Sequence, residues 1–351
     1  MEVGFYIIRN MSKKDYLDGK TILVTGGTGS FGKNFAQYLL TNSKLKKLII
    51  FSRDELKQSQ MQAEMSDDRL RFFIGDVRDI SRLQRAFDGV DIVVHAAALK
   101  QVPALEYNPF EAVKTNILGS QNVIEAALDQ NVEKVVLVST DKAAMPVNLY
   151  GSTKLCAERL FIAGNSYSAN GKTCFSAVRY GNVIGSRGSI IEKLILNKGA
   201  HTVHITEERM TRFWIDLEQA FHIVLFALEN MEGGEIFIPK APVMKLTDLF
   251  DILAPNAKRN VIGIRPGEKV HEVLLTKEEA RHAVELKDYF VILPENISSS
   301  KQKKGLRKFL TIGKPLKPDF QFTSDTTAKI MSRKSLLEIV SQMEQKLLKS
   351  S

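Results

Sequence analysis

Apolar runs and helix-compatible stretches alternate along the first half of the chain. Short runs rich in Val, Ile and Leu occupy 21–27, 47–52, 71–77, 91–97, 134–140 and 175–183. Helical patterns separate them, the longest at 112–128. A strand buried on both faces needs no polar side, so this alternation predicts a parallel sheet covered by helices on both faces. We expect an α/β protein with a doubly wound, Rossmann-type sheet.

The pattern becomes less regular after residue 185. An apolar run at 201–205, a helix at 217–228, a strand at 235–239 and a Pro/Gly-punctuated RPGEK at 265–269 follow. We expect residues 16–185 to form the Rossmann domain and 186–351 a smaller C-terminal substrate-binding portion, with 216–235 returning to the Rossmann domain. No function is placed on residues 1–15.

Composition narrows the functional classes. The 351 residues are 44% hydrophobic and 25% charged, which is typical of soluble globular proteins. No apolar run approaches the roughly 20 residues of a membrane span, so we expect no membrane insertion. Cys156 and Cys174 are the only cysteines. With no secretory apolar segment at the start, they predict a cytoplasmic protein.

The net charge of +9 indicates affinity for anions or simply a basic surface. No aromatic-interleaved basic stripe and no nucleic-acid-binding motif occurs, so a nucleic-acid partner is not expected. A small phosphorylated ligand is the better hypothesis.

Glycines mark a dinucleotide site directly after the first apolar run. Gly26, Gly29 and Gly32 stand where a strand passes into a helix. Such a turn permits close backbone approach to a pyrophosphate, and the helix N-terminus supplies free N–H groups. The alternative is a purely structural turn, which the surrounding strand–helix repetition disfavours.

The end of the second strand predicts which dinucleotide binds. Ser52, Arg53 and Lys57 offer hydroxyl and cationic donors for a 2′-phosphate and favour NADP. Asp54 argues for NAD, unless it opens the following helix.

The next two strand ends add further candidate contacts. Asp76, followed by Val77, could accept from the adenine amino group or serve as a helix cap. The small residues Ala96, Ala97 and Ala98 would let the cofactor lie close over the sheet.

A Tyr-x-x-x-Lys pair follows the fifth strand. Tyr150 and Lys154 would share one helical face, so that the ammonium lowers the pKa of the phenol and binds the nicotinamide ribose. The tyrosine would then act as a base at neutral pH. On its own the spacing also occurs on surface helices, but its place in a dinucleotide fold favours catalysis.

These residues resemble the extended short-chain dehydrogenase/reductase family, in particular its inverting UDP-N-acetylglucosamine 4,6-dehydratases. The supporting strings are GGTGSFG, FSRDELKQ, GDVRD, HAAALKQVP, EAVKTNILGSQNV, STDKAAMPVNLYGSTK, RYGNVIGSRGS, MTRFWI and RPGEKVHE. The resemblance implies an enzyme of the hydro-lyase class. It also implies cofactor contacts from Thr28, Ser30, Phe31 and Lys100.

The resemblance identifies an acid–base pair after the fifth strand. Asp141 and Lys142 follow Thr140. The resemblance implies that retaining dehydratases have an Asp-Glu pair at these two positions and inverting ones an Asp-Lys pair. In the implied mechanism Tyr150 takes the C4 hydroxyl proton during oxidation. Lys142, with a lowered pKa, then removes the C5 proton while Asp141 protonates the departing C6 hydroxyl. Hydride return to C6 and protonation of the other C5 face give UDP-2-acetamido-2,6-dideoxy-β-L-arabino-hex-4-ulose.

The same resemblance implies the substrate contacts. The implied substrate-binding residues are Lys100, Asn182, Arg187, Thr211, Arg212, Arg265 and Glu268. Among them, the arginines would hold the diphosphate of UDP, and the glutamate would bind a ribose hydroxyl. Trp214 is interpreted as core rather than a uracil stack. The histidines lack metal-ligand spacing, so no metal is expected.

Two other functions remain open. A UDP-hexosamine epimerase would use Tyr150 and Lys154 equally well, although Asp141 and Lys142 favour elimination. A non-catalytic NADP-sensing regulator would be expected to lose the tyrosine or lysine. The resemblance further implies a homo-oligomer, with a hexamer as one form, and a place in pseudaminic acid or other surface-polysaccharide biosynthesis.

Overall fold

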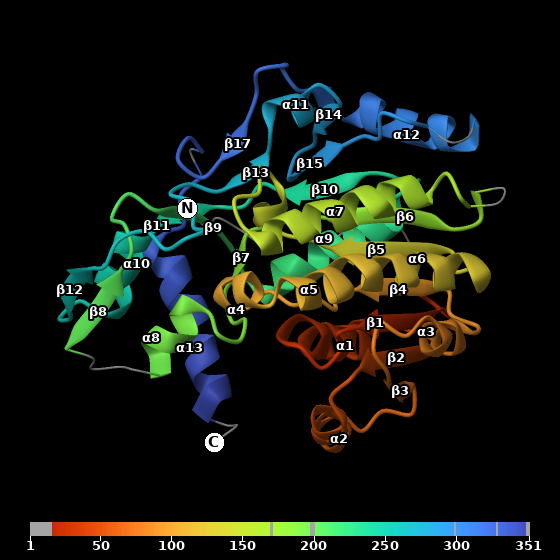
Figure 1. Ribbon diagram of the computed structural model, residues 1–351, viewed down its shortest axis with the longest axis horizontal. Coiled ribbons are helices and arrows are strands. Elements are labelled where there is room, and N and C mark those ends of the chain that lie inside the picture. Colours follow the sequence, from red (N-terminus) through yellow and green to blue (C-terminus); the bar gives the residue numbers. More distant parts are fainter. Residues whose placement is uncertain (1–15, 169–170, 197–200, 298–299, 328, 349–351) are drawn as a thin grey trace.

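A ten-stranded sheet forms the centre of the computed structural model, which describes residues 16–168, 171–196, 201–297, 300–327 and 329–348 (Figure 1). Across the sheet the order is β16 (Lys314–Pro315), β14 (Ala283–Glu285), β15 (Tyr289–Ile292), β10 (Ile236–Pro239), β6 (Cys174–Val178), β5 (Lys134–Val138), β4 (Ile92–His95), β1 (Thr21–Thr25), β2 (Lys47–Ser52) and β3 (Leu70–Ile74). From β3 to β10 neighbouring strands are parallel, and β15, β14 and β16 add antiparallel. The predicted α/β, Rossmann-type fold is confirmed.

Helices cover both faces of this sheet (Figure 1). On one face lie α3 (Ile80–Phe87), α6 (Gly119–Asp129) and α7 (Leu149–Gly164), packed side by side. On the other, α1 (Ser30–Asn42) packs on α9 (Leu217–Asn230) through rings of Phe31, Phe35 and Tyr38 around Phe221. The remaining helices of this part are α2 (Glu55–Glu64), α4 (Val102–Tyr107), α5 (Pro109–Ala112), the π-helix η1 (Val113–Leu118), the 3₁₀-helix η2 (Asp141–Ala143), α11 (Lys277–Ala280) and α12 (Ser300–Ile312).

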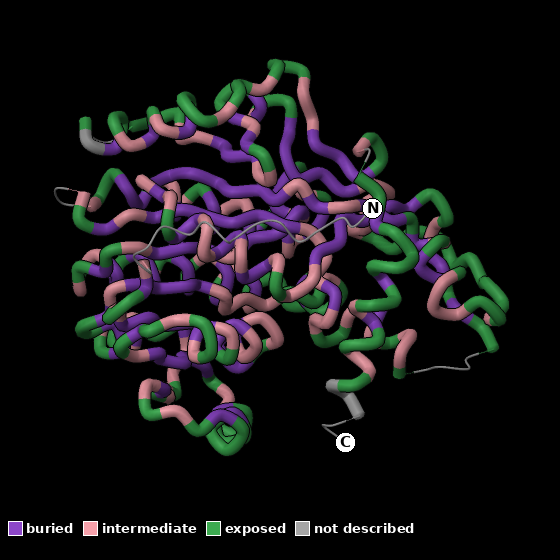
Figure 2. The backbone as a smooth tube through the Cα atoms, turned by 180° about the vertical axis from the view of Figure 1, so that it is seen from behind, coloured by how far each residue is buried: buried purple, intermediate pink, exposed green. Residues whose placement is uncertain are grey.

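The central strands are buried because their sequences are apolar on both faces. Every residue of β1 and β4 is buried, and Figure 2 shows the middle of the sheet as its most buried part. His95 is the one ionisable residue in these two strands. Its ring nitrogens form hydrogen bonds with the hydroxyl groups of Thr25 and Ser120. Burial and the nearby ammonium of Lys154 lower its pKa to about 3, so it is a neutral core residue.

A smaller lobe lies beside the carboxyl ends of the parallel strands (Figure 1). It has its own apolar core, which includes Met210, Trp214 and Phe250. Its elements are α8 (Ile190–Leu196), β8 (Thr202–Ile205), α10 (Leu246–Leu253), β12 (Lys258–Val261) and α13 (Arg333–Leu348). Small sheets join the two parts: β7 (Asn182–Val183), β9 (Thr211–Ile215) and β11 (Val243–Lys245), and separately β13 (Val273–Leu275) with β17 (Phe322–Thr323).

The chain passes between the two parts more than once. Helix α9 packs on the large sheet, strand β10 belongs to it, and β14, β15 and β16 extend it. All five elements come from the portion of the chain after residue 186. Residues 1–15, on which no function was placed, lie outside the described residues. In the part of the chain that is described, no helix is both long and apolar enough to cross a bilayer.

Candidate active site

One cavity of about 1160 Å³ runs between the large sheet and the smaller lobe. This exceeds the range usual for a single small ligand. All but two of the candidate cofactor, catalytic and substrate residues line it; the exceptions are Asp141 and Thr211. The fold therefore brings the candidate cofactor, catalytic and substrate residues to one place.

The glycine-rich turn between β1 and α1 fits a dinucleotide. Gly26 has a φ of 65°, and a Cβ there would lie 2.8 Å from Cα and N of Ala97. Gly29 is the N-cap of α1 and provides no side chain to cap it. The first N–H groups of the helix therefore remain available for a phosphate, at the positive end of the helix dipole.

The end of β2, where we expect the adenosine ribose of the dinucleotide to bind, is called the ribose edge. It has more cations than free carboxylates. Asp54 caps α2, accepting from the Lys57 N–H at 3.0 Å and pairing with its ammonium. Hydrogen bonds from Lys57, with the nearby charge of Arg187, lower the pKa of Asp54. Arg53 is half exposed beside it, and Ser52 Oγ accepts from Gln58. The carboxylate that argued for NAD is thus engaged as a helix cap.

Asp76 is also engaged. Its carboxylate accepts from the Arg78 backbone N–H and from the Arg78 guanidinium at 2.7–3.0 Å. The helix cap at this point is Asp79, which accepts from the Arg82 N–H. The adenine contact of Asp76 stays a prediction.

The catalytic helix is fitted tightly against the acid–base turn. Gly151 follows Tyr150, and a Cβ on it would lie 2.1 Å from the carbonyl oxygen of Lys142. Only glycine therefore permits α7 to approach η2 this closely. Lys154 is 3% exposed, and its ammonium donates to the Val138 carbonyl at 2.8 Å. Burial lowers the pKa of Lys154 to about 8.

The predicted lowering of the Tyr150 pKa by Lys154 is wrong. Burial raises the pKa of Tyr150 to about 12. The cation that opposes this is Lys142, while Asp141 adds to the increase. The ammonium of Lys154 is directed to a backbone carbonyl, so it is Lys142 that stabilises the phenolate.

The expected lowering of the Lys142 pKa is also wrong. Burial lowers it, but the carboxylates of Asp141 and Glu272 outweigh that effect and raise it above its ordinary value. The Lys142 ammonium lies 3.0 Å from Asp141 Oδ1 and 3.6 Å from Glu272 Oε1. Asp141 is fully buried and also accepts from Thr140 Oγ1 at 2.9 Å. The lysine is therefore an ammonium at rest.

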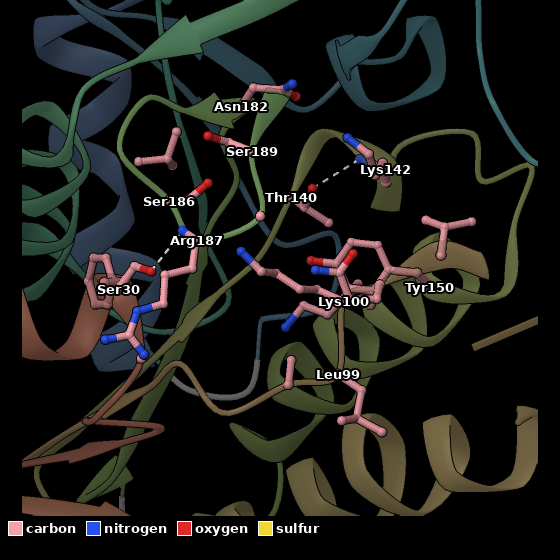
Figure 3. Close-up of a pocket in the computed structure, with 18 of the residues that line it drawn as sticks. Ser30, Leu99, Lys100, Thr140, Lys142, Tyr150, Asn182, Ser186, Arg187 and Ser189 are labelled. Atoms are coloured by element: carbon pink, nitrogen blue, oxygen red, sulfur yellow. Dashed lines mark hydrogen bonds between the residues drawn. The ribbon is translucent and has the colours of Figure 1, made fainter. Parts of the chain in front are cut away.

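Lys100, Lys142 and Tyr150 reach the cavity from three separate segments, the loop after β4, η2 and α7 (Figure 3). Burial lowers the pKa of Lys100, and the charge of Lys142 contributes in the same direction. Positive charge thus gathers around the position where the phenol of Tyr150 would meet a sugar.

The predicted substrate residues divide into two groups. Asn182, Arg187, Arg265 and Glu268 line the cavity, and the Arg187 N–H donates to Ser30 Oγ at 3.0 Å, joining the lobe to α1 (Figure 3).

Thr211 and Arg212 are occupied by other partners. Thr211 Oγ1 bonds with His271 and Ser324 away from the cavity. Arg212 lines the cavity but donates to the carbonyls of residues 211, 269 and 270. Trp214 is 1% exposed in the lobe core, although it also forms part of the cavity wall.

Sequence reasoning missed two residues. Asn116, in the π-helix η1, donates to the Leu99 carbonyl and to Thr153 Oγ1 and accepts from the Leu99 N–H. It thereby ties the loop after β4 to α7, and π-helices often mark functional sites. The second is Glu272, whose only signal was its place at the end of RPGEKVHE.

Comparisons with known proteins agree with this geometry. Residues 22–294 match the family model described as "Polysaccharide biosynthesis protein". A UDP-N-acetylglucosamine 4,6-dehydratase (inverting) of Campylobacter jejuni is 47% identical over 330 residues, which span 93% of this chain and 99% of the relative. A UDP-glucose 4-epimerase of Rickettsia conorii is 42% identical over 281 residues, covering 78% and 82%. The X-ray structure of Pen from Bacillus thuringiensis superposes with a TM-score of 0.84 at 37% identity, covering 94% and 99%.

Proposed function

The chain belongs to the polysaccharide biosynthesis protein family, within the extended short-chain dehydrogenases/reductases, and we propose that it dehydrates UDP-N-acetylglucosamine across C5 and C6 with inversion at C5. It is a hydro-lyase. One observation carries this function: Lys142, paired with the buried Asp141, lines the same cavity as Tyr150 and the glycine-rich turn, in a chain that matches an inverting dehydratase along almost its whole length.

A dinucleotide held on the glycine-rich turn supplies the acceptor and later the donor of the hydride. The turn, the uncapped start of α1 and the residues Ala96–Ala98 would hold it. We assign NADP because Arg53, Lys57 and Arg187 surround the ribose edge while Asp54 is engaged as a cap. Tyr150 acts as a phenolate, which the Lys142 ammonium stabilises, and becomes a phenol when it takes the C4 hydroxyl proton.

The acid–base pair then carries out the elimination. A proton passes from the Lys142 ammonium to the Asp141 carboxylate, 3.0 Å away, leaving an amine and a carboxylic acid. The amine takes the proton from C5, the C5–H electrons form the C5–C6 double bond, and the C6 hydroxyl leaves as water with the proton of Asp141. The pair is then again an ammonium and a carboxylate, so charge and protons balance.

The assignment of the substrate residues follows from the lining of the cavity. Lys100, Asn182, Arg187, Arg265 and Glu268 are proposed to bind the UDP-sugar because they line the cavity. Arg212 is assigned to shaping the cavity wall, and Thr211, which does not line the cavity, to holding His271 and Ser324, since the polar groups of both residues are occupied by protein partners. A cytoplasmic location is proposed from the low cysteine content, since Cys156 and Cys174 are the only cysteines of the sequence. A homo-oligomer and a role in making pseudaminic acid or another surface sugar remain predictions.

Product mass separates this function from its alternative. An epimerase is the second candidate because relatives with that name are 42% identical and the Tyr150–Lys154 pair serves either reaction. Purified protein incubated with UDP-N-acetylglucosamine, without added cofactor, should yield a product lighter by one water. A product of unchanged mass that NMR distinguishes from UDP-N-acetylglucosamine as an epimer would establish the epimerase instead.

A further inference from the structure

Glu272 is a buried carboxylate at the wall of the candidate active site, to which the mechanism above gives no role. It is 2% exposed and directly precedes β13. Its N–H donates to Ser324 Oγ at 2.8 Å, and its carbonyl accepts from the Ser324 N–H at 2.9 Å. Two hydrogen bonds to Ser324 therefore fix the backbone of Glu272, and its side chain faces the cavity.

Three cations surround this carboxylate at similar distances. Lys142 Nζ lies 3.6 Å from Oε1, Arg212 Nε 3.7 Å from Oε1 and Lys269 Nζ 3.7 Å from Oε2. Arg212 also donates to three carbonyls, and Lys269 donates to the Ala144 carbonyl at 2.6 Å. Among the described residues, the Lys142 ammonium has only carboxylate partners, Asp141 and Glu272.

Neither carboxylate is saturated by hydrogen bonds. Within the described part of the chain, Asp141 Oδ2 and Glu272 Oε2 are buried with no hydrogen-bond partner. A buried anion without such bonds depends on nearby cations for its stability. Lys142 and the two carboxylates are consequently coupled, and a change of charge on one alters the proton affinity of the others.

Building on the proposed function, we propose that Glu272 is a positioning residue that holds Lys142 beside Asp141 and strengthens it as the base at C5. Glu272 stays ionised during elimination. When the amine of Lys142 takes the C5 proton, an ammonium forms, and the carboxylate at 3.6 Å stabilises it. Substrate need not touch Glu272 for this effect.

The other charged groups that face Lys142 determine whether loss of the Glu272 charge raises or lowers the proton affinity of Lys142. Arg212 from β9, Lys269 from the loop before Glu272 and Lys100 from the loop after β4 are cations, and Tyr150 approaches from α7. Asp141 is then the sole remaining carboxylate within ion-pair distance in the described structure if Glu272 loses its charge. Lys142 would hold its proton less strongly.

Glu272→Gln tests this in two ways. First, NMR titration of isotope-labelled lysine in the ligand-free protein should show Lys142 losing its proton at lower pH than in wild type. Second, kcat for dehydration should fall roughly tenfold to hundredfold, part of the 10²–10⁴ that general acid–base catalysis contributes. KM and single-turnover oxidation at C4 should change little, and the alkaline limb of the kcat profile should move to lower pH.

Two matched variants separate charge from folding. Glu272→Asp keeps the charge and should retain the wild-type alkaline limb even if kcat falls. Glu278→Gln removes a carboxylate from an exposed position on α11 and should resemble wild type. An unchanged Lys142 titration and kcat profile in Glu272→Gln, or equal shifts in Glu272→Asp, would overturn the inference. Absence of water loss by the wild-type protein would instead contradict the proposed function, and the titration would still decide the role of Glu272.

Discussion

The glycine-rich turn and the charged cluster around Lys142 are built in opposite ways. The turn comes from one continuous segment, and its demands are local: a left-handed φ at Gly26 and an uncapped helix start at Gly29. The cluster joins η2, β9 and the segment before β13, which are far apart in sequence. A short motif can therefore specify the backbone of the turn, whereas the charge state of Lys142 depends on the whole fold.

The largest expected effect lies in the cluster. Lys142→Met removes the proposed base while keeping the length of the side chain, so dehydration should fall by roughly 10²–10⁴. Oxidation at C4 should slow, because Lys142 no longer stabilises the Tyr150 phenolate, but Tyr150 is still present and reduced nicotinamide should still appear in a single turnover. Deuterium uptake at C5 at the wild-type rate would remove Lys142 from this role and, with it, the contrast between the two regions.

The turn is tested by Gly26→Ala. An alanine must adopt φ of 65° and place its Cβ 2.8 Å from Ala97, so a loss of about 1–3 kcal/mol in unfolding free energy is expected, with weaker dinucleotide binding. Gly19 provides the control, since its φ of 73° is similar but no atom lies within 4 Å of an added Cβ. Urea unfolding should show a smaller loss for Gly19→Ala; equal losses would argue against the close approach.

The sequence predicted the turn, the parallel sheet and the helix carrying Tyr150 and Lys154 because each follows from a local pattern. It did not predict the pKa directions of Tyr150 and Lys142. The pKa of Tyr150 is raised by burial, and that of Lys142 by Asp141 together with Glu272, which approaches from another segment. Asn116 escaped for a different reason. Nothing in the pattern of 113–118 distinguishes a π-helix from an α-helix, and its contacts with Leu99 and Thr153 are tertiary.

A more modest effect is expected at the ribose edge. Arg53→Asp should weaken NADP binding roughly tenfold to hundredfold, the value of a charge-assisted contact, and shift preference towards NAD. Arg85→Asp, at an exposed position on α3 away from the cavity, should leave both affinities unchanged. Calorimetric titration with each dinucleotide measures the change. Tighter binding of NAD than NADP by the wild-type protein would refute the ribose-edge argument.

The smallest effect concerns Lys154. Its native pKa of about 8 is below the value of about 10.4 in an unfolded chain, so the unfolded state binds more protons between these values. Stability from this group therefore rises with pH across that window, by about 1 kcal/mol between about pH 7 and pH 9. Lys154→Met lacks this contribution. Urea unfolding at both pH values should show that the unfolding free energy of wild type, relative to that of the variant, increases with pH. The same difference in unfolding free energy at both pH values would contradict the lowered pKa.

The configuration of the product at C5 tests the central claim most directly. Elimination gives a planar intermediate, so the configuration is set by the face of C5 that receives the final proton, and inversion requires the face opposite to the one from which Lys142 took the first proton. Purified protein incubated with UDP-N-acetylglucosamine in D₂O, and examined by NMR at early times, should give the L-arabino 4-keto sugar with one deuterium at C5. The D-xylo epimer alone, before slow exchange can scramble C5, would contradict inversion while leaving the fold and the dinucleotide site in place.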